Sequence, residues 1–286
     1  MTHPVKGVDH AFLLTDDLDA AADQWRRLGF TLSPRGTHSV EKGTANHTII
    51  FQRDYFELLG VLTPVPGNLH QRETLTRDGA GLRAIANRIG DAHEAREALA
   101  ALGIKTDPVG EFSRPLPLPD GGTGTAAFAT TPFSAGEAPR GYIFMCQHKT
   151  PDMVYRPELQ AHANTARALA GIVAVTDAPE AEAQGFARLY AAGAVGAING
   201  GFKVTTGPDS APILLLTPAA AAARWSPEAV AATPAGGFAA LRIAVTDAAA
   251  ARAVIEGAGL RTHSGPGGFW VGPQDAAGAI VEFATA

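Results

Sequence analysis

The feature that most constrains this chain is a pattern of elements that occurs four times. Each copy begins with an apolar run that ends at an aspartate, a residue suited to cap a following helix. The aligned aspartates, Asp16, Asp91, Asp177 and Asp247, lie 75, 86 and 70 residues apart. Self-similarity at a near-constant period predicts a repeated supersecondary unit.

The first copy shows the order of elements within a unit. Residues 7–15 have the composition of a strand, and residues 17–28 carry apolar side chains at helical spacing before Gly29. Extended segments follow at 30–34, 46–52 and 54–61, which gives a β-α-β-β-β unit. Corresponding runs open the other copies at 82–91, 169–177 and 238–247. The fold is therefore predicted to be α+β, with four tandem units.

Proline- and glycine-rich segments predict the boundaries between units. Residues 108–122 are expected to form a long irregular loop, which could be a wall or lid over a pocket. Residues 151–167 separate the second and third units, and short helices are expected at 219–224 and 226–233. We expect an N-terminal domain over 1–156 and a C-terminal domain over 168–286.

Composition excludes several classes of function. The 286 residues carry a net charge of −5, which gives no basic footprint for nucleic acid or an anionic membrane. No run approaches the ~18 apolar residues of a membrane helix. The one cysteine, Cys146, allows no internal disulfide and is expected to be a buried, inert thiol. These features predict a cytoplasmic protein.

The first unit places two metal-competent side chains within apolar strands. His10 shares a strand face with Phe12, and Glu57 shares one with Tyr55. Burying the Glu57 carboxylate costs roughly several kcal/mol unless a cation or another partner meets it. A divalent metal with His10 is one solution. The alternatives are a core histidine bonded to backbone and an ion pair of Glu57 with Arg35 or Arg53.

Four such units, paired two by two, resemble the vicinal oxygen chelate superfamily, which includes glyoxalase I, extradiol dioxygenases and bleomycin-binding proteins. The residues 8–30 and 55–60 carry this resemblance. More narrowly, the chain is similar to glyoxalase-like two-barrel proteins. Matching segments are Gly43, Thr44 and Asn46; Cys146, Gln147 and His148; and Thr150, Pro151, Tyr155, Arg156 and Pro157. The resemblance implies two half-open barrels with a metal in the cup between paired units.

The superfamily's ligand positions fall on the first and last strands of each unit. In unit one they fall on His10 and Glu57, whereas unit two has Ala84 or Ile85 and a position near Phe144. His148 could enter the cup from further along that last strand, or it could be a structural hydrogen-bonder. The expected ligands are His10, Glu57 and His148, and the set suits Zn²⁺, Fe²⁺, Mn²⁺ or Ni²⁺.

The C-terminal barrel is expected to hold no metal of its own. Its matching positions are near Gly171, Leu215, Leu241 and Glu282, and an ion pair of Glu282 with Arg242 is the preferred interpretation. Phe269 and Trp270 are expected to be exposed residues that contact the first barrel. His47 is also expected to be exposed, and His38 and His162 are given no chemical role.

Two functions stay open at this point. The first is a metal-dependent lyase or isomerase of glyoxalase type, in which Glu57 transfers a proton on a small oxygen-bearing substrate. The second is a metal-free binding or resistance protein. Extradiol cleavage ranks lower, because the C-terminal barrel lacks the histidines. A small-molecule ligand is expected in either case, with a homodimer left open, and the expected pocket lining is Phe12, Asn46, Tyr55, Phe144 and, for the binding protein, Trp270.

Overall fold

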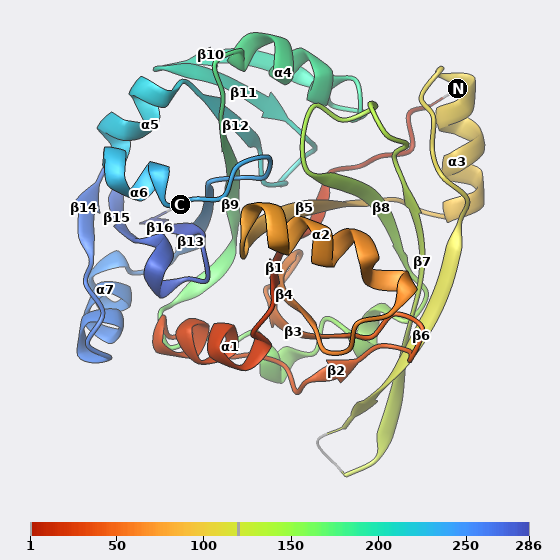
Figure 1. Ribbon diagram of the computed structural model, residues 1–286, viewed down its shortest axis with the longest axis horizontal. Helices are drawn as coiled ribbons and strands as arrows, with labels where there is room; N and C mark the ends of the chain where they lie inside the picture. The colour runs from red at the N-terminus through yellow and green to blue at the C-terminus, as the bar shows by residue number, and fades with distance from the viewer. Residues whose placement is uncertain (1, 119–120, 286) are drawn as a thin grey trace.

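The computed structural model describes residues 2–118 and 121–285 and contains two eight-stranded sheets of identical strand order. The first runs β2-β3-β4-β1-β5-β8-β7-β6 and the second β10-β11-β12-β9-β13-β16-β15-β14. Figure 1 shows that the sheets curl into two neighbouring barrels. Each sheet combines two units, so the predicted pairing of tandem β-α-β-β-β units is confirmed. The domain limits at 156 and 168 stay a proposal for independent folding units.

The elements follow the predicted order in each half of the chain. The first half contains β1 (Val8–Thr15), α1 (Leu18–Arg27), β2 (Gly36–Thr37), β3 (Thr44–Ile50), β4 (Tyr55–Val61), α2 (Leu69–Asp78), β5 (Gly81–Arg88), α3 (Ala92–Ala101), β6 (Gly110–Pro117), β7 (Thr123–Pro132) and β8 (Tyr142–His148). The second half contains β9 (Ala166–Val175), α4 (Pro179–Ala187), β10 (Ala194–Ile198), β11 (Gly201–Thr205), β12 (Ile213–Leu216), α5 (Pro218–Arg224), α6 (Pro227–Ala231), β13 (Ala240–Val245), α7 (Ala248–Gly257), β14 (His263–Gly265), β15 (Gly268–Val271) and β16 (Ile280–Thr285).

The helix that follows the first strand of each unit begins close to the predicted aspartate. Asp91 and Asp247 cap α3 and α7 by accepting backbone N–H groups. The cap of α1 is Asp17, one residue after the predicted Asp16. Helix α4 begins at Pro179 without a side-chain cap. Proline has a fixed φ and no N–H, so it can open a helix without a capping side chain.

The prediction of a loop at 108–122 is wrong for most of this segment. Residues 119–120 of the segment lie outside the described part of the chain. Gly110–Pro117 forms β6, which pairs antiparallel with β7. Because β6 is at the edge of the sheet, Pro115 and Pro117 need no ladder partner on their outer side. The prolines in this segment suggested a loop. The alternation of Phe112, Arg114 and Leu116 toward one face is the signal that indicates a strand.

Helix α2 is an element that the sequence pattern did not indicate. Its only large apolar residues are Leu69 and Leu75, and Thr74 is its buried residue. The helix therefore lacks the apolar stripe that marks a core-packed helix. In Figure 1 it lies across the open side of the first barrel.

The two barrels share one continuous apolar core. Phe30 of the first barrel stacks on Phe283 of β16, and Phe283 stacks on Phe269. Phe269 and Trp270 are 2% and 4% exposed, so the expectation that they are exposed is wrong. Their strand β15 has its neighbours on both sides, and both side chains become interior. His162 bonds the backbone of Thr31 and Ile50, which joins the connector to the first barrel.

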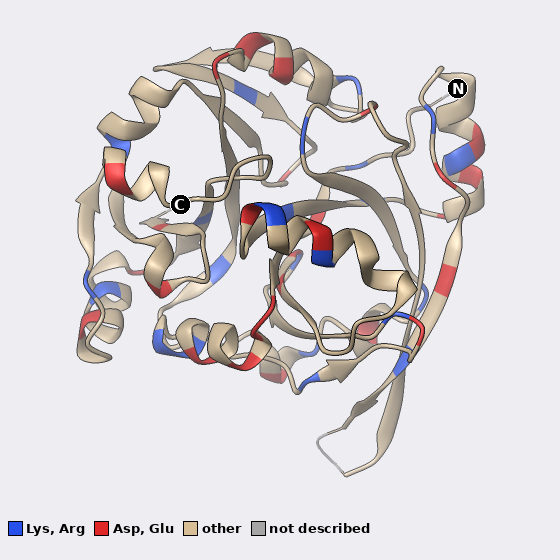
Figure 2. Ribbon diagram, in the orientation of Figure 1, with Lys and Arg blue, Asp and Glu red and all other residues tan. Residues whose placement is uncertain are grey.

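Two further features of the fold are the distribution of its charged residues and the character of its helices. Figure 2 shows acidic and basic residues interspersed along both barrels. Among the described residues, none of the helices combines the length and apolar character that crossing a membrane requires.

Asp54 contributes a pH-dependent contact between the barrels. Its Oδ1 accepts the backbone N–H of Leu169 at 3.0 Å. Burial raises the pKa of Asp54 to about 7; the Leu169 N–H and Arg88 oppose this, and the charge of Asp9 adds to it. The carboxyl group therefore holds a proton in the folded protein at pH values at which the unfolded chain has lost it.

We predict that Asp54→Asn flattens the pH dependence of stability. The stability that Asp54 contributes through its raised pKa is fully present below about pH 4 and is lost as the pH rises through about 7. The wild type should lose on the order of a few kcal/mol of unfolding free energy over this window, and the variant much less. Urea unfolding between pH 4 and 8 measures this. The exposed Asp209→Asn is the control, and parallel curves for wild type and Asp54→Asn would contradict the assignment.

Candidate functional site

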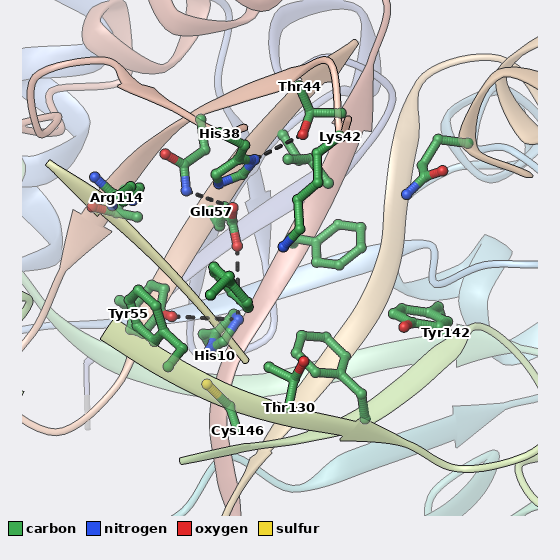
Figure 3. A pocket seen from close by; sticks show the side chains of 18 of the residues that line it. His10, His38, Lys42, Thr44, Tyr55, Glu57, Arg114, Thr130, Tyr142 and Cys146 are labelled. Carbon is green, nitrogen blue, oxygen red and sulfur yellow. Dashed lines mark hydrogen bonds and ion pairs between the residues drawn. The ribbon is translucent and has the colours of Figure 1, made fainter. Parts of the chain in front are cut away.

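The candidate site lies on β1 and β4, which run parallel at the centre of the first sheet. His10 is in register with Tyr55, and Phe12 with Glu57, so His10 and Glu57 are diagonal neighbours on one face. His10 Nε2 lies 3.7 Å from Glu57 Oε2. Figure 3 shows both side chains pointing into the same cavity. The predicted convergence of these two residues is present in the structure.

Each member of the pair has its other polar atom held by a neighbour. His10 Nδ1 lies 2.8 Å from Asp9 Oδ2, and Asn46 Nδ2 donates to Glu57 Oε1 at 2.7 Å. The His10 ring stacks on Tyr55 at 4.1 Å. Neither expected arginine reaches Glu57, because Arg35 pairs with Asp19 and Arg53 with Asp209. His10 Nε2 and Glu57 Oε2 are therefore the atoms that face the cavity.

Asp9 is a site residue that sequence reasoning missed. It lies at an irregularity in the pairing of β1 with β5, between Val8 and His10. Its Oδ2 lies 2.8 Å from His148 Nε2 as well as from His10 Nδ1, and Tyr155 donates its hydroxyl to Oδ1 at 3.0 Å. Burial opposes ionisation of Asp9, but the bonds from the two histidines outweigh it and lower the pKa. Strict alternation would have placed Asp9 on the face opposite His10.

His148 lies on the other side of Asp9 from the cavity that contains Glu57. It lines a separate rear pocket of about 280 Å³, together with Arg88 and Tyr155. The expected triple of His10, Glu57 and His148 is therefore not one cluster. Instead, Asp9, His10 and His148 form a group whose potential ligand atoms lie within 4.8 Å of one another. A ligand role for His148, which the sequence predicted, would belong to this group and not to the cavity that contains Glu57.

The cavity in front of His10 and Glu57, called the N-terminal cup below, has a volume of about 250 Å³. The predicted lining residues Phe12, Asn46, Tyr55 and Phe144 all border it. Cys146 also borders it, and burial raises the pKa of its thiol well above the usual value, which keeps it protonated. Six further residues line the cup that the sequence did not indicate: His38, Lys42, Gln71, Arg114, Thr130 and Tyr142.

Two expectations for histidines need correction. His38 lines the cup, although no role was expected for it. His47 is buried instead of exposed, with Nδ1 2.8 Å from the Ser33 carbonyl oxygen. His47 lies on β3, whose seven residues are all buried, and Ser33 contacts this strand at His47 and Thr48.

The matching cup of the second barrel is filled by its own chain. Ala221 of α5, Trp225 directly after α5, and Ala229 of α6 form a cluster with Trp270. Trp270 therefore belongs to this second cluster and not to the N-terminal cup. Glu282 pairs with Arg242 at 2.9 Å, as predicted, and forms a two-pronged pair with Arg224 at 2.5 and 2.7 Å. This carboxylate is fully engaged by arginine.

Comparison with known proteins agrees with the fold. A hypothetical protein from Staphylococcus aureus superimposes with a TM-score of 0.65 at 11% identity, over 98% of this chain and 99% of that one. A mutant of 4-hydroxymandelate synthase from Streptomyces coelicolor superimposes with a TM-score of 0.57 at 13% identity, over 92% of this chain and 78% of that one. A comparison with curated proteins gives no significant match.

These likenesses define the class of protein. The paired barrels have the vicinal oxygen chelate fold that the sequence predicted. The model of the glyoxalase-like domain matches residues 8–190. The chain belongs to this glyoxalase-like family.

We predict that Asp9→Asn destabilises the fold and that the loss depends on pH. Hydrogen bonds to charged groups contribute about 1.5–3 kcal/mol each, so the loss at pH 7 should be of that order or larger. The pKa of Asp9 is lowered in the folded state, so its contribution is present above about pH 4 and is lost as the pH falls further. Urea unfolding at pH 7 and pH 3 measures both effects. The exposed Asp23→Asn is the control, and equal losses at the two pH values would contradict the assignment.

Proposed function

We propose that the N-terminal cup is the active site of a lyase or isomerase that acts on a small oxygen-bearing substrate with the help of a divalent ion. The proposal is supported above all by one observation. His10 Nε2 and Glu57 Oε2 converge at 3.7 Å in the cup while Asp9 and Asn46 hold their outer atoms.

The donor set suits a divalent ion. An imidazole whose Nδ1 is bonded to a carboxylate presents Nε2 as a ligand, an arrangement typical of metal-binding histidines. Glu57 Oε2 would be the second ligand, and water or substrate oxygens would complete the coordination. The bound ion would supply a Lewis acid that stabilises negative charge on substrate oxygens.

The protein's own residues define the rest of the chemistry. Because Asn46 holds Oε1 of Glu57, the Oε2 atom would have two alternative roles: a ligand of the ion, or, when it is not bound to the ion, the acceptor of a proton from a substrate carbon. The Tyr55 hydroxyl lies 3.4 Å from His10 Nε2, and burial raises its pKa well above the usual value. It therefore stays protonated and can donate a hydrogen bond. Phe12 and Phe144 restrict water at the reacting atoms.

A second candidate function is metal-free binding of a small molecule. Unit two presents Ala84, Ala86 and Phe144 to the apolar cluster that lines the cup, and no ligand from its first strand. An apolar wall of this kind suits a ligand held by shape. The two functions differ in what a metal titration will show.

We expect wild-type protein to bind about one divalent ion and the variants to locate it. The full chain is freed of metal with a chelator and titrated with Zn²⁺ and Mn²⁺ by calorimetry. Glu57→Gln removes a ligand of the cup alone, whereas His148→Gln removes one of the Asp9–His10–His148 group alone. Loss of binding in His10→Ala and Glu57→Gln, with binding kept in His148→Gln, is the expected result.

The exposed His93→Ala serves as the control for removing an imidazole. Loss of metal binding in His148→Gln, with binding kept in Glu57→Gln, would assign the metal to the Asp9–His10–His148 group and contradict the proposed site. No binding by the wild type would favour the metal-free function.

A further inference from the structure

Three basic side chains gather at one end of the N-terminal cup, called its cationic end below: His38, Lys42 and Arg114. His38 and Lys42 come from the turn between β2 and β3, and Arg114 from the edge strand β6. Figure 3 shows them around Glu57, opposite His10. Over residues 2–118 and 121–285, neither Lys42 nor Arg114 forms an ion pair within 4.0 Å. Among these described residues, Glu57 is the one carboxylate that lines the cup.

Lys42 and Arg114 are held against the wall of the cup. The Lys42 Nζ lies 3.3 Å from the centroid of the Phe112 ring, a cation–π contact. Burial lowers the pKa of Lys42, and Glu57 partly offsets this. The half-buried Arg114 passes over Gly36, where a Cβ atom would lie 2.5 Å from its guanidinium nitrogen. Gly36 is thus the residue that leaves room for this guanidinium.

His38 adds a hydrogen-bonding group without adding charge. Its Nδ1 lies 2.7 Å from Thr44 Oγ1. Burial lowers the pKa of His38 to about 4, against the attraction of Glu57 and together with the repulsion of Lys42 and Arg114. At neutral pH the described lining of the cup therefore contains two cations, Lys42 and Arg114, and one acidic side chain, Glu57.

Half-buried cations with no ion-pair partner among the described residues are costly, and a cavity with surplus positive charge concentrates anions. Resting on the function proposed above, we infer that the substrate is a small organic anion. Its carboxylate or phosphate group lies on Lys42 and Arg114, with His38 as a further hydrogen-bond partner. Its neighbouring oxygens face His10 and Glu57.

The cup has room for the anionic group of such a molecule, and an adjoining cavity has room for the rest of a larger substrate. The cup itself accommodates a small head group in about 250 Å³. Gln71 and Tyr142 line both the cup and an adjoining cavity of about 400 Å³ beneath α2. A substrate with a longer tail can therefore leave the cup under this helix.

The test uses chelator-treated full-length protein titrated by calorimetry with oxalate and with inorganic phosphate. We expect binding to one site, with the tighter probe showing whether the cationic end prefers carboxylate or phosphate. Arg114→Gln and Lys42→Met should each weaken binding by about 10-fold or more, because each removes a charge-assisted hydrogen bond. Exposed Arg96→Gln and Lys105→Met are the matched controls and should bind as the wild type does.

Glu57→Gln separates this inference from the proposed catalytic role. It removes the negative charge nearest to the cationic end, so the anion should bind several-fold more tightly even if the cup holds no metal. Tighter binding in this variant, with no metal bound by the wild type, would support the anion site and contradict the metal-dependent function. Absence of binding to metal-free wild type, or equal binding by Arg114→Gln and Lys42→Met, would overturn the inference.

Discussion

The buried carboxylate of Asp9 is the interaction on which the geometry of the site depends. An ionised group in the core needs several hydrogen bonds to offset its lost hydration. Asp9 obtains them from His10 and His148 through one oxygen and from Tyr155 through the other. These partners come from β1, β8 and the connector, so one side chain joins three segments. The same bond to His10 leaves Nε2 directed at Glu57.

The two barrels have the same topology but different contents. Glu57 and Glu282 each lie on the last strand of a unit, β4 of the first unit and β16 of the fourth. Glu57 faces an imidazole and an amide beside an open cavity, whereas Glu282 is clamped by Arg224 and Arg242 under Trp225. Helices α5 and α6 fill the second cup, while α2 lies across the first and leaves space beneath it. Internal duplication thus supplies one cup open to a ligand and one packed as core.

The second barrel also supports the site from behind. Asp54 directly precedes β4 and accepts the N–H of Leu169 on β9, and Val8 at the start of β1 donates its N–H to Ser210. Both strands that carry His10 and Glu57 are therefore anchored at one end to the C-terminal half. The shared core through Phe30, Phe269 and Phe283 makes this contact apolar and continuous. Such anchoring suits a site that must hold two side chains at a set separation.

The sequence by itself determined the repeated unit, the strands that carry His10 and Glu57, and the pair of Glu282 with Arg242. Apolar periodicity and capping aspartates are local signals, so they can be recognised in the sequence before the fold is known. The roles of Asp9 and His148 were decided only by the tertiary structure. An irregularity in β1 turned Asp9 toward His10, and the cationic end of the cup combined a turn and an edge strand about 70 residues apart. Contacts between distant segments depend on how the sheet closes, which no local pattern records.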